Sequence, residues 1–218
     1  MNINNARRIP YIIDRLQELE DSPATAITDG IVVTARNAEG KILAIDYYGG
    51  TIETYRFANQ GSYSAYYALE NVTLKNVVTR VNSKAFSNCA NLKTAIFPDA
   101  TFLGDSFPNC KALEEVFFPK MTDTYISNGT FENCIALKNL QIGSIGFPLS
   151  SLGNTAFRGC TQNFLTINAY CTGDRADTLL ANIRNGATNA TIKIYAAEDT
   201  TYDGDSYAAG ELLLTSEI

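Results

Sequence analysis

One segment recurs four times in the middle of the chain, and this repetition constrains the fold more than any other feature. The copies are FSNCANLKTAIFP from Phe86, FPNCKALEEVFFP from Phe107, FENCIALKNLQIG from Phe131 and FRGCTQNFLTINA from Phe157. They begin at intervals of 21, 24 and 26 residues, which is the length of one solenoid coil. A single coil cannot bury its apolar side, so the copies are expected to stack on one another.

Within each copy the apolar residues fall at positions that would face the inside of a coil. A Leu lies three residues after the Cys. Two apolar strand residues follow it, separated by one residue, and this period of two sends both side chains to the same face of the strand. In the second copy the strand pair is Val116 and Phe118. One inserted residue in the fourth copy moves the match to Phe164, Ile167 and Ala169. Another inward residue precedes each Phe by four or five positions: Val81, Leu103, Ile126 and Leu152.

An earlier and more degenerate copy, YSAYYALENVTLK, precedes these four. It places Tyr63 and Tyr66 at the Phe and Cys positions, and Leu69, Val72 and Leu74 follow in phase. The sequence therefore predicts a short solenoid of about five coils, which stack at a strand spacing of about 4.8 Å.

The pattern Ala-Phe-x-Asn-Cys-x-x-Leu, followed by an alternating strand and Pro, resembles the BspA-like leucine-rich repeat family, a bacterial class. The resemblance covers about half of the chain, from Tyr63 to Tyr170. It implies a mainly β leucine-rich-repeat solenoid with adhesion or surface-binding roles, at the cell surface or outside the cell. The third copy ends in Gly143 where the family has Pro, and the fourth loses its Leu register, so an irregular end is expected.

The two flanks are expected to cover the apolar ends of the stack. The expected division is an N-terminal helix and β-meander cap over 1–60, the solenoid over 61–170 and a C-terminal helix-strand cap over 171–218. In the N-terminal cap the patterns predict a helix from Pro10 to Glu20 and strands over 31–36, 41–47 and 51–57.

In the C-terminal cap the sequence predicts a helix followed by a strand. Asp174 is the expected N-cap, Leu179 and Ile183 lie on the apolar face, and Gly186 ends the helix. A strand around Ile192 then extends the solenoid sheet.

Four cysteines, Cys89, Cys110, Cys134 and Cys160, recur once per coil. Zinc sites bring cysteines in C-x₂-C pairs, whereas about twenty residues separate these thiols. The favoured interpretation is a ladder of buried free thiols. A disulfide between neighbouring coils and a metal cluster are the alternatives. Cys171 lies outside the ladder and is predicted to be the more reactive thiol.

The composition excludes several functional classes. The net charge is −6, the pI is about 4.7, and the basic residues are scattered, so a nucleic-acid partner is not expected. The chain has no histidine, which removes Ser/His/Asp and Cys/His catalysis and the commonest zinc ligand. The acidic segment after Asp199 lacks the bidentate Glu of a calcium loop. We therefore expect no enzyme activity, cofactor or metal.

The N-terminal residues contain an apolar patch of five residues between charges. A secretory signal needs about 7–15 apolar residues and a membrane-spanning helix about 20. No export signal and no membrane insertion are therefore predicted.

The period of two also predicts which strand residues point outward. Ile96 and Phe117 are expected side by side on neighbouring coils, which makes them the candidate ligand anchor. The alternatives are that another segment covers them or that they pair across a dimer. The complete predicted binding row is Thr73, Ile96, Phe117, Gln141 and Asn168, flanked by Asn71, Thr94, Glu115, Asn139 and Thr166.

The functional hypothesis is a non-enzymatic scaffold that recognises a protein or glycan ligand through this face. The alternative is a structural or assembly component, such as part of a phage-type appendage, that forms a homo-oligomer through its N-terminal helix.

Overall fold

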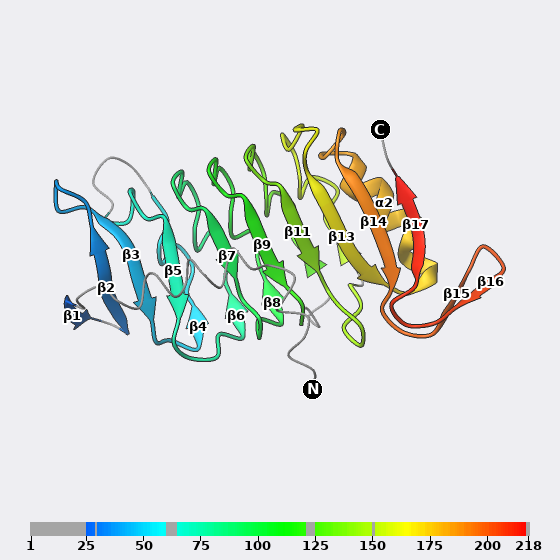
Figure 1. The fold of residues 1–218 in the computed structure, drawn as a ribbon, viewed down its shortest axis with the longest axis horizontal. Coiled ribbons are helices and arrows are strands. Elements are labelled where there is room, and N and C mark those ends of the chain that lie inside the picture. Colours follow the sequence, from blue (N-terminus) through cyan, green and yellow to red (C-terminus); the bar gives the residue numbers. More distant parts are fainter. Residues whose placement is uncertain (1–24, 29, 60–64, 121–124, 150, 217–218) are drawn as a thin grey trace.

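The computed structural model describes residues 25–28, 30–59, 65–120, 125–149 and 151–216, and these residues form an elongated β-solenoid (Figure 1). Each coil contributes a strand to one long face. One sheet on this face has the order β1-β2-β3-β5, and the other has the order β17-β14-β13-β11-β9-β7. Their bounds are β1 Thr25–Thr28, β2 Ile31–Arg36, β3 Ile42–Tyr47, β5 Asn71–Leu74, β7 Thr94–Ile96, β9 Glu115–Phe118, β11 Asn139–Ile142, β13 Thr166–Cys171, β14 Thr191–Ala196 and β17 Leu212–Ser216.

Short strands form the opposite side of the coils. They pair in parallel as β4-β6-β8 and as β10-β12. Their bounds are β4 Thr51–Ile52, β6 Arg80–Val81, β8 Phe102–Leu103, β10 Tyr125–Ile126 and β12 Ser151–Leu152. The predicted inward residues Val81, Leu103, Ile126 and Leu152 all lie on these strands and are buried, as expected.

The core between the two sides is built on a ladder of phenylalanine rings. Each ring is buried and stacks on its counterpart in the next coil, with ring centroids 5.2 to 5.9 Å apart. The ladder consists of Phe57, Phe86, Phe107, Phe131 and Phe157. Stacked aromatic pairs add to the stability already gained from burial, so every coil supports its neighbour.

The Asn of the repeat forms a second ladder at the turn after the Phe. Asn88, Asn109 and Asn133 have φ values of 61°, 62° and 59°, a left-handed conformation that Asn tolerates better than most residues. Asn133 Nδ2 donates to Asn109 Oδ1 at 2.9 Å, and Asn109 Nδ2 donates to Asn88 Oδ1 at 2.9 Å. Gly159 takes this position in the fourth copy, also with positive φ.

The N-terminal meander differs from the prediction at its third strand. The predicted strands over 31–36 and 41–47 are β2 and β3, which pair antiparallel. The predicted strand over 51–57 is wrong, because only β4 is extended and it pairs in parallel with β6. Phe57 instead occupies the Phe position of a repeat, since its ring stacks on Phe86 at 5.2 Å. Tyr63 and the predicted N-terminal helix lie outside the described residues.

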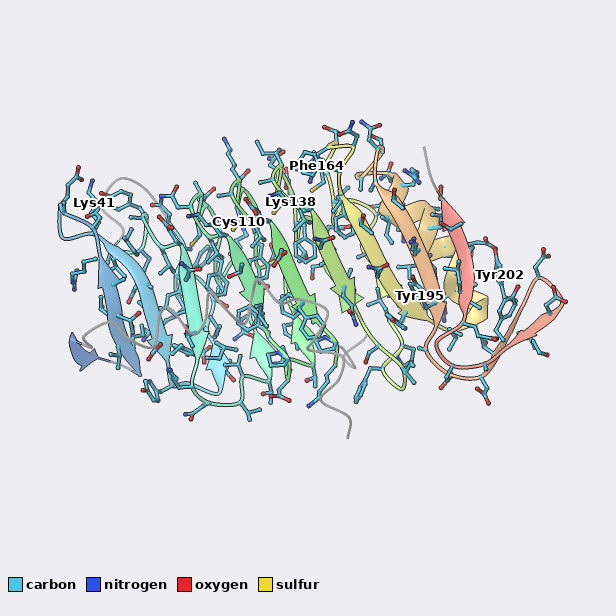
Figure 2. All side chains as sticks on the ribbon, viewed as in Figure 1. Lys41, Cys110, Lys138, Phe164, Tyr195 and Tyr202 are labelled. Carbon is cyan, nitrogen blue, oxygen red and sulfur yellow. The ribbon has the colours of Figure 1, made fainter. Side chains whose placement is uncertain are left out.

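The fourth repeat also corrects one assignment. Leu165, and not Phe164, fills the inward position: Leu165 is fully buried and 53% of the Phe164 surface is exposed. Figure 2 shows Phe164 at the turn before β13. Ile167 and Ala169 are buried as predicted, because the shift in register ends within the turn.

The C-terminal region continues the sheet and then covers its end. β14 pairs in parallel with β13 as predicted, and β17 adds an antiparallel edge strand. α2 (Ala176–Arg184) packs against β12, β14 and β17. Asp174 is not its N-cap, because a 3₁₀ turn over Gly173–Arg175 precedes the helix. Two short strands, β15 (Thr200–Tyr202) and β16 (Asp205–Tyr207), form a projecting hairpin (Figure 1).

One hydrophobic cluster runs from Ile31 in β2 to Leu213 in β17. The domain boundaries at residues 60 and 170 stay a prediction. No helix in the described parts of the chain is long and apolar enough to cross a membrane.

Candidate recognition surface

Four of the five predicted binding residues lie in one row across the outer face of the long sheet. Direct pairing joins Ile96 to Phe117, Phe117 to Gln141, and Gln141 to Asn168. All four side chains are partly buried, while their strand neighbours alternate into the core. Thr73 lies on β5 in the other sheet, where it pairs with Asp46. A binding role for these residues stays a prediction.

The polar residues of the flanking row lie one step along the same strands. Thr94, Glu115, Asn139 and Thr166 pair in sequence, and Thr191 continues the row. The remaining member, Asn71, lies on β5 and pairs with Ala44 on β3. The flanking row therefore supplies mostly hydroxyl and amide groups to the outer face.

Glu115 is the unusual member of the flanking row. Its Oε2 atom is buried and has no hydrogen-bond partner in the described part of the chain. Burial raises the pKa of the Glu115 carboxyl, and the neighbouring charge of Glu114 raises it further. The nearby Lys138 ammonium and the Asn139 amide oppose this pKa shift.

A tyrosine pair extends the outer face beyond the predicted residues. Tyr170 on β13 pairs with Tyr195 on β14, and their rings stack with centroids 5.1 Å apart and planes at 23°. Sequence reasoning missed this pair, although a signal was present. Tyr170 and Tyr195 follow Asn168 and Lys193 by two residues, so the period that placed Asn168 outward also places both tyrosines outward.

Exposure changes along the outer face. Near the N-terminal end, Val32, Thr34 and Ala44 are buried although their pairing places them on the same face as Asp46. Near the C-terminal end, Asn168, Tyr170, Lys193 and Tyr195 are only partly buried. The outer face is therefore least accessible over β2 and the first half of β3.

The repeated thiols lie on the inner side, away from this face. Each is buried and donates a hydrogen bond to the carbonyl oxygen of a ladder Phe in the preceding coil. For example, Cys110 Sγ lies 3.1 Å from the carbonyl oxygen of Phe86. The four sulfur–oxygen distances lie between 3.0 and 3.3 Å, for Cys89, Cys110, Cys134 and Cys160. All are free thiols, so the predicted buried ladder is correct and the disulfide alternative is wrong.

Burial makes these thiols poor acids. It raises the pKa of Cys89 and of Cys160 to about 12, and it raises that of Cys110 and Cys134 well above the ordinary value. The prediction that Cys171 is more reactive is wrong. Cys171 ends β13 as an inward residue with no exposed surface, and burial raises its pKa to about 12.

The acidic segment after Asp199 forms the β15–β16 hairpin, with Asp203 and Gly204 as its two-residue turn. Among the described residues, no group of three or more His, Cys, Asp or Glu side chains is placed to hold a metal ion.

Comparison with known proteins places the repeats in a family. The family model described as a BspA type leucine rich repeat region matches residues 51–173 in six copies. The match begins at β4, in agreement with the position of Phe57 in the phenylalanine ladder. Searches of the curated proteins and of the solved structures found no match. Because the matched residues make up more than half of the chain, the protein belongs to the BspA-type leucine-rich repeat family.

Proposed function

We propose that the protein is a non-enzymatic recognition scaffold with an adhesion-like role, which binds its ligand through the outer face of the long sheet. The family supports a repeat-based interaction scaffold. The observation that carries the proposal is the row of Ile96, Phe117, Gln141 and Asn168, which lie in register on four neighbouring strands.

The solenoid suits this role because it holds the row rigidly. The phenylalanine and thiol ladders fix each coil against the next, so the backbone that carries the outer side chains needs no further ordering on binding. Ile96 and Phe117 lie next to each other on β7 and β9. A large apolar pair beside polar groups has the composition of an interface anchor with a polar rim.

The test is a binding screen of the full chain against purified extracellular proteins and soluble glycans, followed by titration of each positive ligand. Loss of an aromatic anchor costs about 2 kcal/mol or more, so Phe117→Ala should weaken binding at least about tenfold.

The matched control is Phe102→Ala, because Phe102 is a partly buried aromatic on β8, on the opposite side of the coils. It should leave the affinity unchanged. Equal losses for the two variants, or none for Phe117→Ala, would reject the outer face as the binding surface.

A further inference from the structure

The C-terminal half of the outer face has a chemistry that points to one class of ligand. We infer that β11, β13 and β14 bind a neutral oligosaccharide, through the Tyr170–Tyr195 pair, the polar groups of Gln141 and Asn168 next to it, and Thr191 further along the same face. This inference rests on the proposed function, because it names the ligand class for the same face.

The tyrosine pair supplies a partly exposed aromatic surface on the outer face. The two rings stack on each other, and both side chains remain partly exposed. The next residue after β11 is Gly143, and a Cβ there would lie 2.8 Å from the Phe147 carbonyl oxygen and 3.4 Å from Tyr170 Cβ, so the backbone passes close to Tyr170 at this point. Aromatic side chains of this kind combine an apolar body with a polar tip, so they can contact sugar C–H groups and hydroxyls together.

The adjacent polar groups are free to bind a ligand. Asn168, Thr166 and Thr191 have no side-chain hydrogen bond within the described part of the chain, and Gln141 Nε2 donates only to the carbonyl oxygen of Gly143 at 3.3 Å. Amides and hydroxyls both donate and accept hydrogen bonds, as sugar hydroxyls do. Most polar side chains on this surface can therefore both donate and accept hydrogen bonds, and few can only donate or only accept.

The charge of this surface favours a neutral ligand. The chain as a whole carries −6, but Lys193 is the one charged residue among the outward positions of β11, β13 and β14. Acidic residues of the C-terminal region lie outside these strands, as with Asp177 in α2, Asp203 in the hairpin turn, and Glu211, whose carbonyl oxygen accepts from Ala196 N at the end of β14. Arginine, which is common at protein hot spots, is absent from the outward positions of these three strands. A neutral oligosaccharide matches this surface better than a protein or a charged polymer.

The experiment is a titration of the full chain with soluble neutral oligosaccharides of glucose, mannose, galactose and N-acetylglucosamine, at up to millimolar concentration. Sialylated and sulfated oligosaccharides serve as the charged comparison. We expect at least one neutral oligosaccharide to bind. The sialylated and sulfated oligosaccharides should bind no more tightly than neutral ones. Absence of binding to every neutral oligosaccharide would overturn the inference.

Variants locate the site. Tyr195→Ala should weaken oligosaccharide binding at least about tenfold, a loss of about 1.4 kcal/mol. Tyr48→Ala is the matched control, since Tyr48 is 41% exposed and lies after β3, far along the solenoid. Asn168→Ala is an independent second variant that removes an amide and leaves the ring stack, and it should also weaken binding. Unchanged affinity in both Tyr195→Ala and Asn168→Ala would exclude this site.

The same measurements also distinguish a wrong ligand class from a wrong proposed function. A protein ligand whose affinity falls in Phe117→Ala, in a chain that binds no neutral oligosaccharide, would reject the sugar and retain the recognition face. A neutral oligosaccharide whose affinity falls in Tyr195→Ala but not in Phe117→Ala would support the sugar site and remove Phe117 from it.

Discussion

The inside of the coils and their outer sheet face follow opposite rules. Inside, Phe86 and Phe107 stack with centroids 5.2 Å apart and planes at 5°, so each inner side chain contacts its own counterpart in the next coil. Outside, the row across the strands contains Ile96, Phe117, Gln141, Asn168 and Lys193, with no residue type repeated. Contact between copies favours identical inner residues. The family is therefore recognised from the inner face, and a ligand has to be sought on the outer face.

The largest effect expected from this comparison is on stability. Phe107→Ala removes a fully buried ring that stacks on two others and should lower the free energy of unfolding by about 3–5 kcal/mol. Phe117→Ala changes the same residue type on the outer face and should cost about 1 kcal/mol or less. Guanidinium denaturation of both variants measures the difference. Equal losses would mean that Phe117 also belongs to the core.

The second effect concerns the chemistry of the inner thiols. A pKa raised from 9.0 to about 12 lowers the thiolate population about a thousandfold, and only the thiolate reacts rapidly with iodoacetamide. All five cysteines, Cys171 included, should resist labelling in the native protein and react after denaturation. Mass spectrometry of timed samples reports the modification at each position.

An outer-face thiol provides the control for this labelling. Asn168→Cys places a sixth thiol on β13, three residues before Cys171 and on the opposite face. It should label readily while Cys171 does not. Rapid labelling of Cys171 in the native protein would show that the end of β13 opens to solvent.

The inner positions were predictable from the sequence because repetition and the period of two specify them together. Val116 and Phe118 are buried in β9, as their spacing predicted. The same period also specifies the outward residues, which is why Ile96 and Phe117 lie together in the predicted row. The role of an outer residue was not predictable in this way, because contacts with the adjacent coils do not restrict which residue type stands there.

The errors arose where the spacing between repeats changes. Phe57 and Asn59 carry the Phe-x-Asn signal of a coil, but an insertion separates them from Tyr66, whose backbone occupies the Cys position. The short segment Phe-Ala-Asn could have identified this coil. The β15–β16 hairpin likewise had a readable signal, since Asp203-Gly204 between two short polar segments is a typical two-residue hairpin turn.

A smaller effect is expected at the asparagine ladder, which lies at the edge of the inner face. Asn109→Ala removes two side-chain hydrogen bonds and places Ala at φ 62°, so we expect a loss of about 2 kcal/mol in the free energy of unfolding. Asn109→Gly removes the same hydrogen bonds but tolerates this φ, and it should cost about 1 kcal/mol. Equal costs in denaturant unfolding would show that the left-handed backbone contributes nothing.

The smallest expected effect is on the outer face, at Glu115, whose raised pKa makes stability depend on pH. The folded protein holds this proton more tightly than the unfolded chain does. The stability that the protonated carboxyl contributes is therefore fully present below the ordinary pKa of 4.5 and is lost as pH rises through the folded value.

Glu115→Gln should therefore be more stable than the native sequence at pH 7, by less than about 1 kcal/mol because the side chain is only partly buried. The two proteins should become equally stable well below pH 4.5. Glu70→Gln is the control, since Glu70 pairs with Lys93 at 2.6 Å and its loss should give no gain at pH 7. Thermal unfolding across this pH range measures both variants, and a destabilised Glu115→Gln at pH 7 would mean that the carboxylate has a favourable partner in solution.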